Sequence, residues 1–222
     1  MSEKMPMRAQ APTSKEQAIV EAAAKRFRYY GIGKTTMQEI AQDAGMAVGT
    51  LYLYFANKDA LVAACAEKYA QRHRQQADEI LNSDLLPDEK LRAYVIDRFR
   101  QAEDTRTSSR HAAEITRAVL RVKPGRIREE GQMMHAVVVQ ILNEGIASGL
   151  FRIVDVNRDA TIFLYSLVAF FPNALSEPQI VPLEEDLVSV VDWFLDTWKS
   201  GAREPKKKSA GAGRRAKVRD KA

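Results

Sequence analysis

Residues 35–58, TTMQEIAQDAGMAVGTLYLYFANK, are the stretch of this chain whose residue types and order indicate a defined binding surface. Two short segments with helical apolar spacing, 36–44 and 48–55, flank a turn that contains Gly45. This spacing is that of a helix-turn-helix. Ala41 is small enough to let the two helices cross closely. A second helix exposed in this way fits the major groove of B-DNA.

The two short helices are expected to divide their side chains between a core and an outer face. Ile40, Val48 and Leu51 are spaced to pack the pair against the helices on either side. Thr35 is the predicted N-cap of the first short helix, with Gln38 in the capping-box position. The side chains expected on the outer face of the second are Ala47, Gly49, Thr50, Leu53 and Tyr54.

The elements that must position this surface are helical along almost the whole chain. Apolar residues follow the helical period, and no convincing β alternation is present. The predicted helices span about 14–30, 36–44, 48–55, 58–81, 88–106, 109–122, 127–149, 158–171 and 183–199. The fold expected is therefore all-α with about nine helices. A three-helix head with the helix-turn-helix occupies 14–57, and a second helical domain occupies 58–200, with helix 58–81 linking the two.

Charge is distributed unevenly between the body of the chain and its end. The chain has 34 Lys and Arg and 29 Asp and Glu, a net charge of +5. Nine of those basic and two of those acidic residues lie in 203–222, so the rest has 25 basic and 27 acidic residues. Residues 201–222 are predicted to be a disordered basic tail, and 1–13 a disordered N-terminus. The tail is either a solubilising terminus or an arm that adds sequence-independent affinity for nucleic acid.

Composition excludes several classes of protein. Cys65 is the single cysteine, which excludes an internal disulfide framework and fits a reducing cytoplasm. The N-terminus lacks an apolar signal region, and the longest apolar run, 162–171, is too short to span a bilayer. No metal-ligand spacing, phosphate loop, nucleophile–base pair or carboxylate dyad is recognisable. The sequence predicts a cytoplasmic protein without membrane contact that is not an enzyme and has no metal or cofactor.

Residues 14–68 resemble the TetR family of transcriptional regulators. KEQAIVEAAAKRFRYYGIGKTTMQEIAQDAG resembles the first two helices of that family, and MAVGTLYLYFANKDAL resembles its recognition helix and the start of its fourth helix. EGIASGLFR (144–152) is similar to a pattern that precedes the last two helices of the family. The resemblance implies DNA contacts at the matching positions, which are Thr35, Thr36, Ala47, Val48, Gly49, Thr50, Tyr52, Leu53, Tyr54 and Lys58.

The resemblance also implies a role for each of these positions. Thr35 and Thr36 at a helix N-terminus, together with Tyr52 and Lys58, contact phosphates, and residues 47–50 approach base edges. Ala47, Val48 and Gly49 lack hydrogen-bonding side chains, so that base readout depends on thymine methyl groups, Thr50, Tyr54 and DNA shape. Without the surrounding pattern, Tyr52, Tyr54 and Phe55 would equally fit core aromatics.

The remaining helices are expected to form a dimer interface and a ligand pocket. Segment 160–171 is apolar nearly all round and 183–199 has a broad apolar face, which by resemblance form a four-helix bundle across a two-fold axis. The predicted interface residues are Ile162, Leu167, Phe171, Leu187, Val191, Phe194, Leu195 and Trp198. The predicted pocket residues are Phe99, Met133, Met134, Val137, Phe163 and Phe170, which also fit a plain core. Four arginines share one helix face if their helix is continuous: Arg106, Arg110, Arg117 and Arg121. This face would be either a binding site for an acidic effector or a solvated surface.

The function predicted is that of a homodimeric, sequence-specific DNA-binding regulator. By resemblance it is a repressor that an unidentified small-molecule effector releases from a pseudo-palindromic operator. Three alternatives remain open: a transcriptional activator, a helical enzyme or carrier, and a nonspecific DNA-compacting protein that binds through its basic tail.

Overall fold

A computed structural model describes residues 14–171, 175 and 183–201. Of the predicted disordered segments, residues 1–13 and 202–222 lie outside the described residues, whereas Gly201, predicted as the first tail residue, is the C-cap of the last helix. Within the described part of the chain, every regular element is helical. These elements are α1 (Ser14–Tyr30), α2 (Met37–Asp43), α3 (Val48–Tyr54), α4 (Lys58–Leu81), α5 (Pro87–Thr107), α6 (Ala112–Val122), α7 (Arg126–Ala147), α8 (Val156–Ser166), the 3-10 turn η1 (Val168–Phe170) and α9 (Glu184–Ser200).

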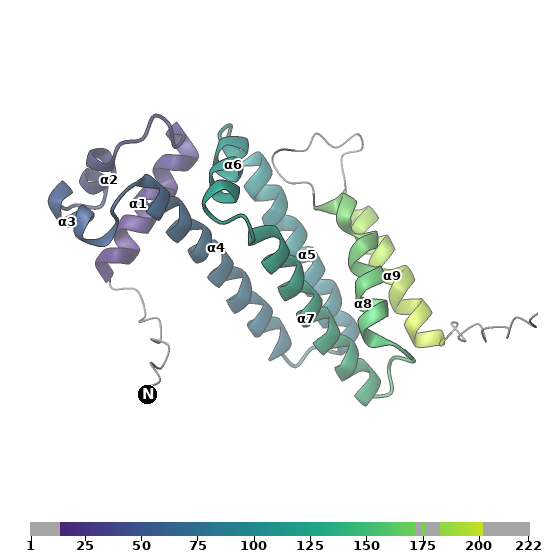
Figure 1. Ribbon diagram of the computed structural model, residues 1–222. Helices are drawn as coiled ribbons and strands as arrows, with labels where there is room; N and C mark the ends of the chain where they lie inside the picture. Colours follow the sequence, from purple (N-terminus) through teal and green to yellow (C-terminus); the bar gives the residue numbers. More distant parts are fainter. Residues whose placement is uncertain (1–13, 172–174, 176–182, 202–222) are drawn as a thin grey trace, which may run out of the picture.

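Helices α1, α2 and α3 gather at one end of the molecule, and α4 runs from this head along the second domain (Figure 1). The head has a core of its own, which includes Ile19, Phe27, Ile40, Leu51 and Leu61. Gly45, with a φ of 68°, makes the turn between α2 and α3 in the left-handed conformation that favours glycine. The predicted helix-turn-helix is therefore present in the fold.

The N-cap of α2 differs from the prediction by one residue. Thr36, not Thr35, caps the helix: its Oγ1 accepts a hydrogen bond from the Glu39 backbone N–H at 3.2 Å. Glu39 Oε2 accepts in return from the Thr36 backbone N–H at 2.8 Å, which completes a capping box. Thr35 faces inward instead, where its hydroxyl donates to the Gly31 carbonyl at 2.7 Å.

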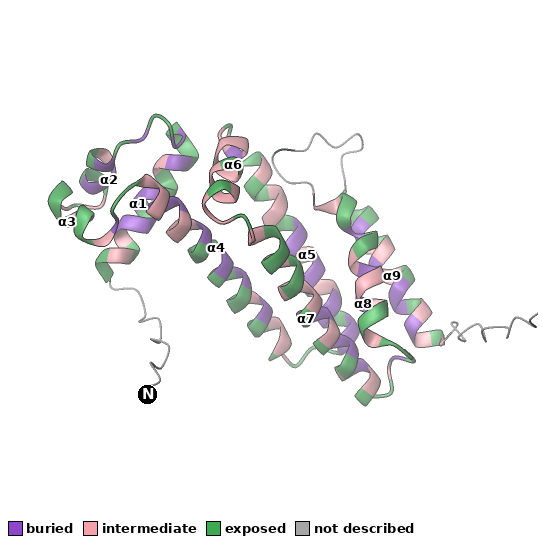
Figure 2. Ribbon diagram, in the orientation of Figure 1, coloured by how far each residue is buried: buried purple, intermediate pink, exposed green. Residues whose placement is uncertain are grey.

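The second core lies between α5, α7, α8 and α9 and is the larger of the two (Figure 2). It contains six of the eight residues predicted at the dimer interface: Leu167, Leu187, Val191, Phe194, Leu195 and Trp198. It also contains three of the six predicted pocket residues, Phe99, Val137 and Phe163. Five of these six interface residues are buried within their own chain and do not reach a surface, whereas Phe194 also lines a groove at the surface. Phe99, Val137 and Phe163 lie in this core and are not part of the cavity lining described below.

One of the predicted helices is interrupted, and the break predicted between 106 and 109 is present. The segment predicted as one helix over 158–171 ends as α8 at Ser166 and continues as η1. The arginines at 106, 110, 117 and 121 do not share one helix face, because α5 ends at Thr107 and α6 begins at Ala112.

Candidate DNA-binding face and ligand pocket

Helix α3 lies at the outer edge of the head and is largely uncovered (Figure 1). Leu51 is its buried residue and joins the head core, whereas Leu53 is 85% exposed and Tyr52 is 52% exposed. Ala47, Val48 and Gly49 at its start are exposed as well, so Val48 does not take the packing role predicted for it. Thr50 and Tyr54 are half-buried.

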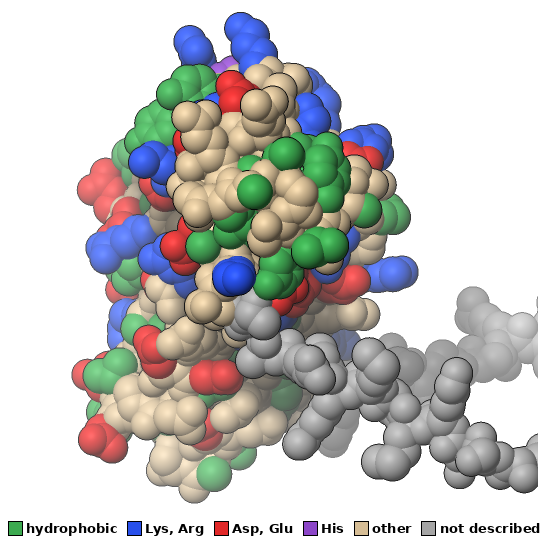
Figure 3. Space-filling view, turned by 90° about the vertical axis from the view of Figure 1, so that its left-hand side faces the viewer, with side chains coloured by type: hydrophobic (Ala, Val, Ile, Leu, Met, Phe, Trp, Pro, Cys, Tyr) green, Lys and Arg blue, Asp and Glu red, His purple; other side chains and the backbone are tan. Residues whose placement is uncertain are grey.

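The face that carries α3 combines exposed apolar side chains with basic ones. Figure 3 views the molecule from the head side and shows hydrophobic side chains in the middle of the face, with Lys and Arg side chains and several Asp and Glu side chains around them. These outward side chains are not part of the head core, which is formed by other residues such as Leu51, Ile40 and Phe27. Apolar side chains suit thymine methyl groups and basic side chains suit phosphates, so this face has the chemistry for duplex DNA.

Two residues predicted to contact phosphates, Thr35 and Lys58, instead make contacts within the protein. The Thr35 side chain is buried and cannot reach a ligand outside the head. The Lys58 ammonium group donates to the carbonyls of Ile32 and Thr35 at 2.8 and 2.9 Å, which ties the loop before α2 to the start of α4. Thr36 is exposed at the N-terminus of α2, in a position open to solvent.

An ion pair that the sequence analysis did not identify fixes the angle between α1 and α2. Arg26 of α1 donates from Nε to Asp43 at 2.6 Å and from Nη2 to the same carboxylate at 3.2 Å. Its Nη1 lies 3.1 Å from Glu39. The hydrogen bond with Arg26 is the largest cause of the lowered pKa of Asp43. Only the folded arrangement brings these residues together, since α1 and α2 are separated by a loop.

A cavity of about 900 Å³ lies between α4, α5, α6, α7 and α8. Of the six predicted pocket residues, only Met134 lines it. Met133 and Phe170 are half-buried outside its lining, and Phe171, predicted at the dimer interface, lines it instead. Most of the wall is apolar, and Phe27 and Ile32 of the head contribute to it.

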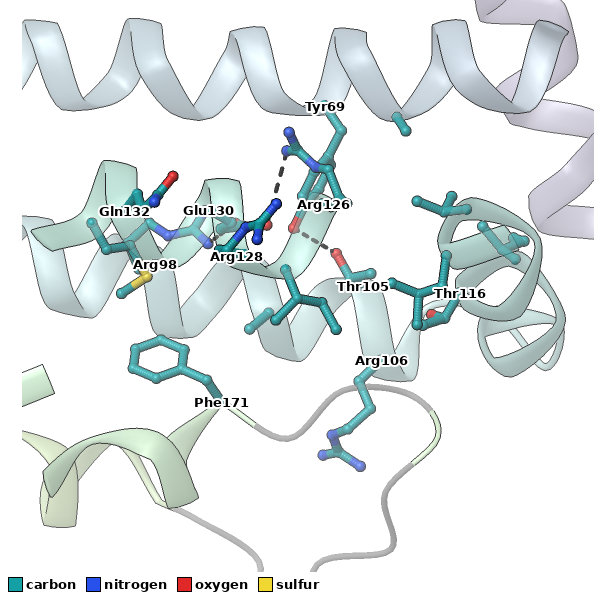
Figure 4. Close-up of a pocket in the computed structure, with 18 of the residues that line it drawn as sticks. Tyr69, Arg98, Thr105, Arg106, Thr116, Arg126, Arg128, Glu130, Gln132 and Phe171 are labelled. Atoms are coloured by element: carbon teal, nitrogen blue, oxygen red, sulfur yellow. Dashed lines mark hydrogen bonds and ion pairs between the residues drawn. The ribbon is translucent and has the colours of Figure 1, made fainter. Parts of the chain in front are cut away.

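One side of the cavity carries a group of arginines around a single carboxylate (Figure 4). Arg98 of α5 contacts both Glu130 of α7 and His73 of α4 through short hydrogen bonds. Arg126 lies 3.8 Å from the same carboxylate. Burial alone would raise the pKa of Glu130, but the hydrogen bond with His73 and the charges of Arg98 and Arg126 outweigh it and lower that pKa to about 2.

His73 and Cys65 are held in their neutral forms. Burial lowers the pKa of His73 below its usual value, despite the neighbouring Glu130. Burial also raises the pKa of the Cys65 thiol to about 12, so the cysteine is protonated and unreactive, as its position on the apolar face of α4 predicts.

Helix α6 connects the cavity to the head. Ile115 and Val119 line the cavity and also pack against the head core. Glu114 accepts a hydrogen bond from the Gly33 backbone N–H at 2.7 Å. Arg121 binds Asp59 at the start of α4 at 2.6 and 2.7 Å. The helix therefore contacts both the cavity and the head.

Helices α8 and α9 form the side of the molecule that lies away from the head (Figure 1). Their inner faces are in the core, but the outer surface of α9 carries Trp193 at 57% exposure. A shallow groove between the two helices is lined by Ile162, Ser166, Ser189, Val190, Trp193 and Phe194. Of the predicted interface, Ile162 and Phe194 reach this groove.

The described residues also bear on two kinds of feature that the sequence analysis excludes, membrane-spanning helices and metal sites. Among the helices that the structure describes, none is long and apolar enough to cross a membrane. The described side chains form no group of three or more His, Cys, Asp or Glu that could hold a metal ion.

Comparison with known proteins identifies the class. The model for bacterial regulatory proteins of the tetR family matches residues 19–65, and that for the tetracyclin repressor-like C-terminal domain matches residues 87–191. Together they span the head and most of the second domain. The chain therefore belongs to the TetR family of transcriptional regulators.

Individual relatives agree with this assignment. The chain is 27% identical over 179 residues to the HTH-type transcriptional regulator YhgD of Bacillus subtilis, an alignment that covers 79% of this chain and 91% of YhgD. It is 26% identical over 140 residues to the HTH-type transcriptional repressor KstR2 of Mycobacterium tuberculosis, covering 63% and 70% of the two chains. A crystal structure of a transcriptional regulator from Cytophaga hutchinsonii superposes with a TM-score of 0.64 at 26% identity, covering 84% of this chain and all of that one.

Proposed function

We propose that the protein is a homodimeric repressor that binds a pseudo-palindromic operator and is released from it by a small molecule. The observation that supports the DNA-binding part is the exposure of α3, which presents Tyr52 and Leu53 outside a complete head core. Similarity to a named repressor supports repression over activation. The proposal places the protein in the cytoplasm, where bacterial DNA lies.

The proposed dimer forms through the outer surface of α8 and α9. Trp193 is a large aromatic side chain that is more than half exposed beside an apolar groove. Aromatic side chains of this kind are enriched in protein interfaces. Pairing this surface with its two-fold copy would place two α3 helices on one side of a duplex, as a pseudo-palindromic operator requires.

The proposed ligand site is the cavity, and α6 and α4 are the elements that connect it to the head. Phe27 and Ile32 belong to both the cavity wall and the head. A ligand that changes the packing of α6 or α4 therefore changes the position of the head. To release DNA, it must bind more tightly to the conformation whose heads do not match the operator.

Selection of binding sites from random-sequence DNA, followed by gel-shift titration, tests the DNA-binding proposal. We expect an enriched inverted repeat that the protein binds in the presence of excess nonspecific competitor. Tyr52→Ala should weaken this binding by about tenfold or more, the size of one lost DNA contact. Tyr29→Ala, which truncates an exposed tyrosine of α1, is the matched control and should leave binding unchanged.

The same assay separates this proposal from binding through the basic tail. Deletion of residues 203–222 should preserve the selected sequence and reduce only the salt dependence of binding. Failure to enrich any sequence, or loss of all DNA binding on deletion of the tail, would contradict the helix-turn-helix assignment. A promoter–reporter fusion then distinguishes repression from activation by the sign of the change.

A further inference from the structure

The charges that line the cavity are strongly unequal. Glu130 is the one carboxylate among the described lining residues, whereas four arginines line the same cavity: Arg98, Arg106, Arg126 and Arg128. The charge of Arg106 is offset by Glu103 of the same helix, whose carboxylate accepts a hydrogen bond from the Arg106 guanidinium group at 2.8 Å. The other three arginines, here called the arginine cluster, have only Glu130 between them.

Each member of the arginine cluster has unused capacity to bind an anion. The Arg98 side chain is 7% exposed, and its Nε has no hydrogen-bond partner among the described residues. The Arg126 side chain is 12% exposed, and its ion pair with Glu130 is long, at 3.8 Å. Arg128 forms no ion pair with any described carboxylate. Arg98 and Arg126 share the Glu130 carboxylate and Arg128 has none, so three guanidinium groups and one carboxylate leave a net charge of +2 at the cavity wall.

Arg98 is buried and Arg126 is mostly buried, whereas Arg128 is exposed at the edge of the cavity. Buried positive charge in excess of its carboxylate partner is costly unless an anion offsets it. Guanidinium groups removed from water lose hydration, and only a paired charge with hydrogen bonds restores that free energy. Arginine binds carboxylate and phosphate oxygens in pairs of parallel hydrogen bonds. Figure 4 shows Arg98, Arg126, Arg128 and Glu130 together on one side of the cavity, with Arg106 apart from them.

The rest of the wall has the opposite character. Beyond the arginine cluster the cavity is lined by apolar side chains of the head, α4 and α6, among them Phe27, Ile32, Val62, Ile115 and Val119. A volume of about 900 Å³ is ample for an extended chain as well as its polar end. We infer that the effector is an elongated apolar molecule with one anionic end, which the arginine cluster binds while the apolar part extends toward Phe27 and Ile32.

This inference rests on the proposed ligand site and specifies its chemistry. Four probes with the same ten-carbon chain test it on the full-length protein: decanoate, decyl phosphate, decanol and decyltrimethylammonium, each below its critical micelle concentration. Calorimetric titration measures the dissociation constants. We expect at least one anionic probe to bind about tenfold or more tightly than decanol, as a charge-assisted hydrogen bond predicts, and the cationic probe to bind more weakly than decanol. The tighter of the two anions identifies the effector as a carboxylic acid or a phosphate ester.

Variants of the arginine cluster distinguish charge recognition from a loss of structure. Arg126→Gln and Arg128→Gln should weaken binding of the preferred anion about tenfold and leave the dissociation constant of decanol unchanged, whereas a damaged cavity would weaken both. Arg100→Gln is the matched control on α5, because Arg100 is exposed and pairs with Glu184 outside the cavity. High salt should reduce the preference for the anion.

Three results would overturn the inference: equal binding of decanol and both anions, preferential binding of the cation, or binding of none of the probes. DNA binding by the ligand-free protein is measured separately by gel shift. A protein that binds its operator but does not prefer the anions keeps the proposed function and loses this ligand assignment. A protein that prefers the anions but selects no DNA sequence keeps this ligand assignment and loses the proposed DNA-binding function.

Discussion

At the scale of single residues, the contact between Arg98, Glu130 and His73 joins three helices, α5, α7 and α4. The carboxylate of Glu130 is mostly buried, yet its pKa is about 2 because the neighbouring positive groups and the hydrogen bond with His73 outweigh its burial. The folded protein therefore stabilises the ionised form of Glu130 more than the unfolded chain does. This stabilises the fold at any pH at which both states are ionised.

Glu130→Gln should consequently destabilise the protein in a pH-dependent way. The stabilisation is fully present above the ordinary carboxyl pKa of 4.5 and is lost as the pH falls toward 2. We expect the free energy of unfolding of the variant to be lower by about 3 kcal/mol at neutral pH. This difference should become smaller below about pH 4.5. Urea unfolding at fixed protein concentration over this range measures it. Glu129→Gln, an exposed neighbour on α7, is the control; a constant difference for Glu130→Gln at every pH would contradict the assignment.

At the scale of elements, the turn after α7 shows how a short sequence pattern determines packing. Gly149, with a φ of 76°, reverses the chain, and the N–H groups of Leu150 and Phe151 both donate to the Gly145 carbonyl at 2.8 and 3.0 Å. The ring of Phe151 then lies directly over Gly145, where a methyl group would overlap several ring carbons. Phe151 is buried in the second core and has no room to withdraw.

Gly145→Ala should therefore destabilise the fold by about 1–3 kcal/mol through overpacking. Gly131→Ala provides the comparison within the same helix. A Cβ at Gly131 meets no atom within 4 Å, so the better helix propensity of alanine should stabilise the protein by about 0.5–1 kcal/mol. Thermal and urea unfolding of both variants measure the difference. Equal effects at the two positions would show that helix propensity, and not the contact with Phe151, determines the result.

At the scale of the whole molecule, the head and the α8–α9 surface lie at opposite sides of the molecule (Figure 1), and the cavity lies between helices α4 to α8. The head and the cavity share Phe27, Ile32 and α6. The cavity and the α8–α9 surface share α8, whose Thr161 and Leu164 line the cavity while Ile162 and Ser166 line the outer groove. A change at any one region therefore acts on helices that form the next.

Trp193→Arg should convert the proposed dimer to a monomer. A charged side chain at the centre of an apolar interface is left without a partner on the two-fold related copy and costs several kcal/mol. Sedimentation velocity measures the mass in solution, and the monomer should bind the selected operator far more weakly, because one head contacts one half-site. Leu86→Arg changes an equally exposed apolar residue in the loop before α5 and should remain dimeric. A dimer that persists in Trp193→Arg would contradict the proposed interface.

The sequence alone was sufficient for features that depend on local order. Helical periodicity, the turn at Gly45 and the TetR resemblance predicted the helices of the described chain and the exposure of Tyr52 and Leu53 on α3. These signals are local, since a helix buries or exposes residues at a fixed spacing whatever it packs against. Where local signals competed, the prediction was less accurate: Thr36 caps α2 in place of Thr35 because Thr35 is drawn into the core.

Only the tertiary structure decided what each apolar helix face contacts. Segment 160–171 and α9 are apolar on several sides, so periodicity could not separate a face that meets the core from one that meets a partner or a cavity. Leu187 and Trp198 thus proved to be core, while Trp193 is exposed. The arginine cluster was likewise invisible, because Arg98 lies far from Arg126 and Glu130 in the sequence. Packing of α5 against α7 brings these charges together, and that arrangement determines the chemistry of the cavity.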